Sequence, residues 1–92
     1  MGDMAIAARI EGRVQGVSFR AWTRQEARAR GLSGWVRNAG DGSVRAHLQG
    51  PQDAVTAMLE ALRHGPAAAR VDRIETEPAP PDPDLSDFTI LR

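Results

Sequence analysis

The sequence predicts an α+β fold, and three observations support this fold class. Residues 6–14 and 43–49 alternate apolar and polar side chains, with the period of two that is typical of half-buried strands. Residues 20–30 and 51–64 are rich in good helix formers and contain no internal helix breaker. Turns rich in Gly and Pro separate these segments.

The first half of the chain is predicted to form a strand, a helix and a hairpin. In residues 6–14, Ile6 and Ile10 share one face, and charged residues occupy the other. The helix covers residues 20–30, RAWTRQEARAR, and ends at Gly31.

The hairpin consists of residues 34–49. Its first strand, residues 34–38, is followed by AGDG, in which the Asp-Gly pair is typical of a tight turn. Its second strand, residues 43–49, alternates Val44, Ala46 and Leu48 with Arg45, His47 and Gln49. We expect His47 and His64 to have structural or surface roles, and Trp22 and Trp35 to be packing residues.

The second helix is bounded by two Gly-Pro pairs. Pro51 is predicted at the first helical position, where the missing N–H costs least, and Gly65 ends the helix. Its apolar residues recur at the i, i+3, i+4, i+7 spacing of a helix that faces the core, and they are Ala54, Val55, Met58, Leu59 and Leu62.

The remaining residues are predicted to form two strands joined by a linker. In the strand at residues 70–76, Val71 and Ile74 differ in parity, which predicts a bulge or a late strand start. Residues 78–84, PAPPDPD, are typical of an extended linker with polyproline character, and residues 88–91 form a short strand along an edge. The order βαββαβ, plus this extra strand, predicts the ferredoxin-like split βαβ arrangement, with two helices on one face of an antiparallel sheet.

Composition narrows the function classes. The 92 residues suit a single domain, 1–92, and the absence of cysteine excludes a thiol nucleophile and fits a reducing, cytoplasmic location. No apolar run approaches the ~18 residues of a membrane span, and the N-terminus lacks signal-peptide features. The 12 basic and 12 acidic residues balance, unlike the basic surface of a nucleic-acid-binding domain. We therefore expect a monomer with no nucleic-acid or membrane partner.

The stretch GRVQGVSFR, residues 12–20, joins the first strand to the first helix. A helix N-terminus has unpaired backbone N–H groups and a partial positive charge, and glycine lets several N–H groups converge on one anion. Arg20 lies in the first helical turn, where its planar guanidinium can hold two phosphate oxygens. The stretch lacks the P-loop and dinucleotide-binding patterns. Taken alone it is also compatible with glycines that only permit the turn and with a solvated Arg20.

Asn38 strengthens the interpretation of this loop as an anion cradle. The first two strands are joined by a helical crossover and should run parallel, so their C-terminal ends lie at the same edge of the sheet. Asn38 ends the second strand and should therefore lie near the cradle. Its amide can donate and accept hydrogen bonds, which suits a residue that holds a water molecule. Asparagine before a Gly-rich turn also has a purely structural explanation.

The motifs GRVQGVSFR and GWVRNAGDGSV, followed by Gly50, resemble those of the acylphosphatase family over residues 6–91. The resemblance implies hydrolysis of carboxyl-phosphate anhydrides, with Arg20 binding the phosphate and Asn38 positioning the attacking water. It implies no metal and no cofactor. The expected substrate-binding residues are Val14, Gln15, Gly16, Val17, Ser18, Phe19 and Arg20. The chain departs from the family pattern at Arg30, often apolar in the family, and at its Leu91-Arg92 end.

Two other functions are compatible with such a fold. An RNA-binding module would need aromatic residues on the open faces of the first and third strands, where the sequence has none. A non-catalytic anion sensor would bind phosphate in the cradle without turnover, but it would have little need of Asn38.

Overall fold

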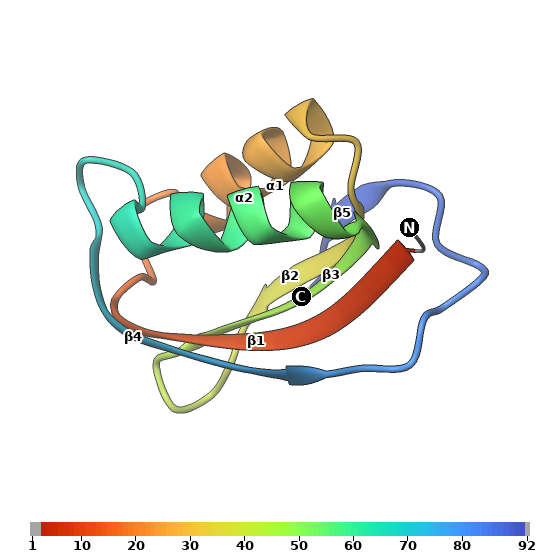
Figure 1. The fold of residues 1–92 in the computed structure, drawn as a ribbon. Coiled ribbons are helices and arrows are strands. Elements are labelled where there is room, and N and C mark those ends of the chain that lie inside the picture. The colour runs from red at the N-terminus through yellow and green to blue at the C-terminus, as the bar shows by residue number, and fades with distance from the viewer. Residues whose placement is uncertain (1–2, 92) are drawn as a thin grey trace.

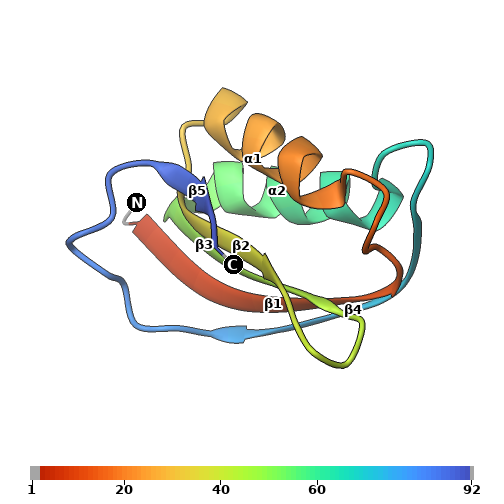
Figure 2. The ribbon, with the colours of Figure 1, turned by 180° about the vertical axis from the view of Figure 1, so that it is seen from behind.

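The computed structural model describes residues 3–91, which form two helices on one face of a five-stranded sheet (Figure 1). Among residues 3–91, both helices lie on this one face and the opposite face of the sheet is not covered by a helix (Figure 2). The elements are β1 (Asp3–Arg13), α1 (Phe19–Ala29), β2 (Ser33–Asn38), β3 (Val44–Pro51), α2 (Gln52–His64), β4 (Arg70–Pro78) and β5 (Phe88–Ile90). The predicted element order and the ferredoxin-like α+β class are confirmed. Neither helix is long and apolar enough to cross a membrane.

The sheet has the strand order β4-β1-β3-β2-β5. β1 pairs antiparallel with β3 and β4, and β2 pairs antiparallel with β3. β1 and β2 therefore run parallel to each other on either side of β3, as the helical crossover predicted. The added strand β5 lies at the edge, as expected, but pairs parallel with β2, so the complete sheet is mixed.

The core lies between the helices and the sheet face that they cover. α2 contributes a stripe of fully buried side chains, Val55, Met58 and Leu62, at the helical spacing that the sequence predicted. Pro51 was expected at the first position of the second helix. It instead ends β3 and occupies the N-cap position, one residue before α2 begins at Gln52. Arg30 causes no packing defect, since its guanidinium pairs with Glu26 at 2.7 Å.

The antiparallel pairing of β1 with β4 contains a β-bulge. The register passes from Glu11 opposite Arg73 to Gly12 opposite Val71, which leaves Asp72 as the extra residue of β4. This bulge explains the parity of Val71 and Ile74, both of which pack against the core. Gly12 allows β1 and β4 to pack closely at the bulge, because a Cβ at this position would lie 2.1 Å from the Arg70 carbonyl oxygen. The glycine is therefore required by the strand pairing, and not by the loop that follows.

Gly34 permits an even closer approach, between β2 and β3. Its φ is +146°, and a Cβ at this position would lie 1.8 Å from the His47 carbonyl oxygen and 3.1 Å from the Phe88 ring. The obstacle on the β3 side is backbone, which cannot move away without opening the strand pair. Gly34 therefore fixes how closely the strand that carries Asn38 packs into the sheet.

We expect Gly34→Ala to lower the free energy of unfolding by about 2–4 kcal/mol, from backbone strain and from the clash with β3. Gly40→Ala is the matched control, because a Cβ at Gly40 has no neighbour within 4 Å. Its effect should stay within about 0.5 kcal/mol. Urea denaturation measures both variants, and equal stabilities would contradict the close approach at Gly34.

Candidate active site

The loop at residues 14–18 leaves β1 and turns into the N-terminus of α1. Gly16 has φ +74° and Ser18 has φ +61°, so two alternate residues adopt left-handed backbone conformations. This type of turn makes successive backbone N–H groups point toward a common point. Within residues 3–91, no hydrogen bond uses the backbone N–H groups from Gly16 to Ala21, and the first turn of α1 contains no acidic residue. The loop is thus a concave set of free donors at the positive end of a helix.

A hollow of about 360 Å³ opens above this loop. It brings together the two predicted catalytic residues, Arg20 from α1 and Asn38 from the end of β2. Its lining is Val14, Gly16, Ser18, Phe19, Arg20, Ala21, Asn38 and Ile90. The parallel arrangement of β1 and β2 explains this meeting, because both strands end at the same edge of the sheet.

Arg20 lies half-buried in this hollow. It forms no ion pair with any residue from 3 to 91, whereas Arg28 and Arg30, at the other end of the same helix, each pair with a carboxylate. A guanidinium without a partner, beside unbonded backbone N–H groups, gives the hollow a positive potential that suits a small anion.

Asn38 lines the hollow and carries a hydrogen-bond acceptor, its side-chain oxygen. Its side-chain oxygen Oδ1 is buried and has no hydrogen-bond partner among the described residues. A buried polar atom without a partner is costly, by about 1–3 kcal/mol, unless a ligand or water supplies the missing donor. The Asn38 Oδ1 is therefore a place where a water molecule can donate a hydrogen bond.

Gln15 connects the cradle loop to the β2–β3 hairpin. Its side-chain nitrogen Nε2 donates to two backbone carbonyls, those of Ala39 and Ser43, each at 2.8 Å. These carbonyls flank the mouth of the turn that directly follows Asn38, where the Ala39 N–H also donates to the Ser43 carbonyl at 2.8 Å. Gln15 thus fixes the position of the loop relative to Asn38.

The β2–β3 turn is itself held by Asp41. Its Oδ1 accepts hydrogen bonds from the Ser43 hydroxyl at 2.6 Å and from the Ser43 N–H at 3.0 Å, and its other oxygen pairs with Arg9. The Ser43 hydroxyl, the Ser43 N–H and the Arg9 guanidinium together hold the pKa of the Asp41 carboxyl far below its usual range. The Asp41 carboxylate therefore keeps its negative charge at ordinary pH values.

The structure places the predicted binding residues in different surroundings. Val14 and Phe19 are each 1% exposed, and their side chains belong to the core. Gln15 and Val17 do not line the hollow. Ala21 and Ile90 do line it and were not predicted; the helical position of Ala21, one residue beyond Arg20, was the only available signal. Nothing in the sequence alone placed β5 beside the loop.

The chain matches known proteins over almost its full length. The family described as Acylphosphatase matches residues 6–90. An acylphosphatase of Rhizobium etli is 54% identical over 86 residues, which cover 94% of this chain and 92% of the relative. An acylphosphatase of Mesorhizobium japonicum is 60% identical over 73 residues, or 79% of this chain and 78% of the relative.

Solved structures of acylphosphatases have the same fold as this chain. The crystal structure of acylphosphatase from Bacillus subtilis superposes with a TM-score of 0.92 at 32% identity, and covers 97% of this chain and 99% of its own. An acylphosphatase from Coxiella burnetii gives the same TM-score at 34% identity, over 97% of this chain and 93% of its own. On the strength of its sequence, its fold and the hollow between α1 and β2, the chain belongs to the acylphosphatase family.

Proposed function

We propose that this chain hydrolyses acyl phosphates in the hollow between α1 and β2, with Arg20 and the backbone amides of residues 14–20 holding the phosphate and Asn38 positioning the water. The activity is that of the family and its relatives. The assignment of roles is supported by one observation above all. Arg20, Asn38 and the loop line the same hollow, and within residues 3–91 the Arg20 guanidinium, the Asn38 Oδ1 and the loop N–H groups have no partner.

The phosphate dianion of the substrate is the group that the cradle suits. The loop N–H groups and the N-terminus of α1 donate to its oxygens, and Arg20 can donate two parallel hydrogen bonds. Phosphoryl transfer has a loose transition state whose charge is spread over three equatorial oxygens. Donors that are already in place at those oxygens stabilise that charge without reorganisation during the reaction.

The attacking water is the group that Asn38 suits. One O–H of the water donates to Asn38 Oδ1, which leaves a lone pair of the water oxygen free to face phosphorus. A new bond forms between this oxygen and phosphorus, and the bond from phosphorus to the acyl oxygen breaks with its electron pair. The products are a carboxylate and inorganic phosphate, and the water's proton passes to a phosphate oxygen.

The leaving group explains why so few side chains suffice. A carboxylate leaves as the conjugate base of an acid whose pKa is roughly 4, as for Asp or Glu, so no general acid has to protonate it. Catalysis then consists of positioning the water and stabilising charge. A cradle that grips only the phosphate should tolerate different acyl groups.

Three properties stay predictions from the sequence: a monomeric state, a cytoplasmic location and the absence of nucleic-acid binding. The balanced charge of 12 basic and 12 acidic residues supports the last of these.

Benzoyl phosphate and phenyl phosphate test the function as a matched pair. Both carry a phosphate and an aromatic ring, but their leaving groups are the bases of acids with pKa values of about 4 and about 10. We expect rapid phosphate release from benzoyl phosphate, in a buffer that contains a metal chelator, and no measurable release from phenyl phosphate. Phosphate binding without turnover of either compound would indicate an anion sensor instead.

Arg20→Ala should reduce kcat/KM by roughly 10³-fold or more, by analogy with other arginines that hold a transferred phosphoryl group. Affinity for inorganic phosphate should fall as well. Arg24→Ala, one helical turn further along α1 and outside the lining of the hollow, is the control and should behave like the wild type. Near-normal turnover of Arg20→Ala would remove Arg20 from the mechanism.

Asn38→Ala should fold, bind inorganic phosphate normally and lose about 10²–10³-fold in kcat, the size of effect expected for one oriented polar group in a transition state. Steady-state kinetics and phosphate inhibition measure the two properties separately. A collapse of phosphate affinity with little change in kcat would make Asn38 a binding residue and not the holder of the water.

A further inference from the structure

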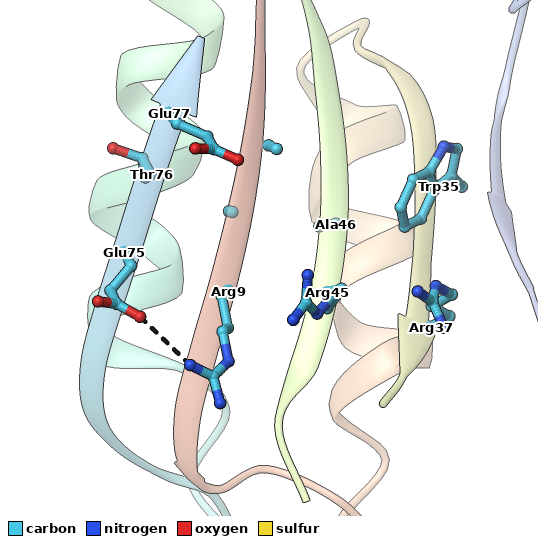
Figure 3. Close-up of a pocket in the computed structure, with 10 residues that line it drawn as sticks. Arg9, Trp35, Arg37, Arg45, Ala46, Glu75, Thr76 and Glu77 are labelled. Atoms are coloured by element: carbon cyan, nitrogen blue, oxygen red, sulfur yellow. Dashed lines mark hydrogen bonds and ion pairs between the residues drawn. The ribbon is translucent and has the colours of Figure 1, made fainter. Parts of the chain in front are cut away.

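The sheet face away from the helices carries two rows of side chains that run directly across the strands (Figure 3). In one row, Arg37 lies opposite Arg45, Arg45 opposite Arg9, and Arg9 opposite Glu75. In the next row, the order is Trp35, His47, Ala7 and Glu77. Within these two rows, the charged residues on β2 and β3 are arginines and those on β4 are glutamates.

The three arginines of the first row differ in how they are neutralised. Arg9 pairs with Asp41 and, at 3.4 Å, with Glu75. Arg37 and Arg45 form no ion pair within residues 3–91, and they occupy directly opposed positions in the pairing of β2 with β3. Like charges in directly opposed positions of a sheet destabilise it, so an anion between these two guanidinium groups would relieve a repulsion.

The second row provides an aromatic surface beside this charge. Trp35 is half-buried and stacks on His47, with ring centroids 6.2 Å apart and planes inclined by 20°. The Arg37 Cζ lies 5.9 Å from the centroid of the Trp35 ring. The indole is thus held in place by two neighbours before any ligand arrives.

A hollow of about 390 Å³ extends across the sheet face from Trp35 on β2 to Glu75 and Glu77 on β4. Its floor includes the small Ala7 side chain and the backbone of β3 at Ala46, whose own side chain is buried in the core on the other face. Its walls include Trp35, Arg45 and Glu77 (Figure 3). This volume is within the range of small-molecule sites, roughly 300–1,000 Å³, in which a few polar groups orient an otherwise apolar ligand.

We propose that this open-face site binds a small, planar aromatic anion. The ring lies over Ala7 against Trp35, and the anionic group lies between the guanidinium groups of Arg37 and Arg45. Glu77, on the opposite side of the hollow, repels a second negative charge there and so selects ligands whose charge is at one end. The site is on the opposite sheet face from the phosphate cradle, and the proposal stands independently of the catalytic roles of Arg20 and Asn38.

Naphthalene-1-sulfonate is a suitable probe, because it combines a planar ring with one charge at one end. The titration is followed by ¹H–¹⁵N NMR on the full chain, with saturating inorganic phosphate present to occupy the cradle. We expect saturable shifts of the Trp35 indole N–H and of backbone amides in β1, β2 and β3, and little change at the Trp22 indole. Methanesulfonate, which lacks the ring, and 1-naphthalenemethanol, which lacks the charge, should each bind roughly tenfold or more weakly.

Two variants assign the anion contact. Arg45→Gln and Arg37→Gln should each weaken naphthalene-1-sulfonate binding roughly tenfold, the loss expected for one charge-assisted hydrogen bond, and should retain activity toward benzoyl phosphate. Arg63→Gln, on the exposed side of α2, removes the same charge elsewhere and should have no effect. Unchanged affinity of both open-face variants, or shifts confined to Trp22 and the cradle, would overturn the proposal. It would also be overturned if the same amides shifted with protein concentration in the absence of the probe, because a second copy of the chain would then occupy this face.

Discussion

Two hydrogen bonds from a single side chain hold the active site together. Gln15 lies in the cradle loop, yet its amide nitrogen donates to the Ala39 and Ser43 carbonyls across the mouth of the β2–β3 hairpin. The loop carries the free N–H groups and the hairpin carries Asn38, so this amide sets the distance between the loop and Asn38. Such a contact joins segments 24 and 28 residues apart in the chain. The Gln15 contact also depends on the shape of the β2–β3 turn, which the hydrogen bonds between Ser43 and Asp41 maintain.

The distribution of charge around the cradle follows from what each arginine contacts. Arg28 is tied to Asp87 by hydrogen bonds of 2.9 and 3.1 Å, which fasten the start of β5 to α1. Those contacts hold Ile90 at the wall of the hollow, and they use up the positive charge at that end of the helix. Arg20, at the N-terminal end, has no carboxylate partner among residues 3–91. The same residue type therefore serves packing at one end of α1 and leaves an uncompensated charge at the other, where the helix dipole adds to it.

Much of this arrangement could be predicted from residue patterns, and the failures have identifiable causes. The apolar periodicity of residues 6–14 predicted a strand, and the spacing of Val55, Met58 and Leu62 predicted a helix. In the structure these apolar side chains are buried as the two periods require. The meeting of Arg20 and Asn38 followed from the parallel run of β1 and β2. The direction of β5 could not be predicted, because three residues of strand carry no signal for parallel or antiparallel pairing. The clamp made by Gln15 was equally hidden, since its partners are backbone carbonyls that any residue would present. Trp35 was expected to pack, but the sequence did not reveal that it packs on His47 outside the core.

Strand β2 shows how one short segment serves two faces of the molecule. Gly34 and Val36 are buried under the helices, and Asn38 continues this alternation toward the cradle. Trp35 and Arg37 alternate with them and line the hollow on the open face. A slip of one residue in the pairing of β2 with β3 would exchange the two sets, and would place Arg37 on the side of the sheet that faces the helices. Gly34 prevents that slip, because only a residue without a Cβ fits against the His47 carbonyl in the observed register. The close contact of β2 with β3 thus keeps the amide and the arginine of adjacent residues on opposite sides of the sheet.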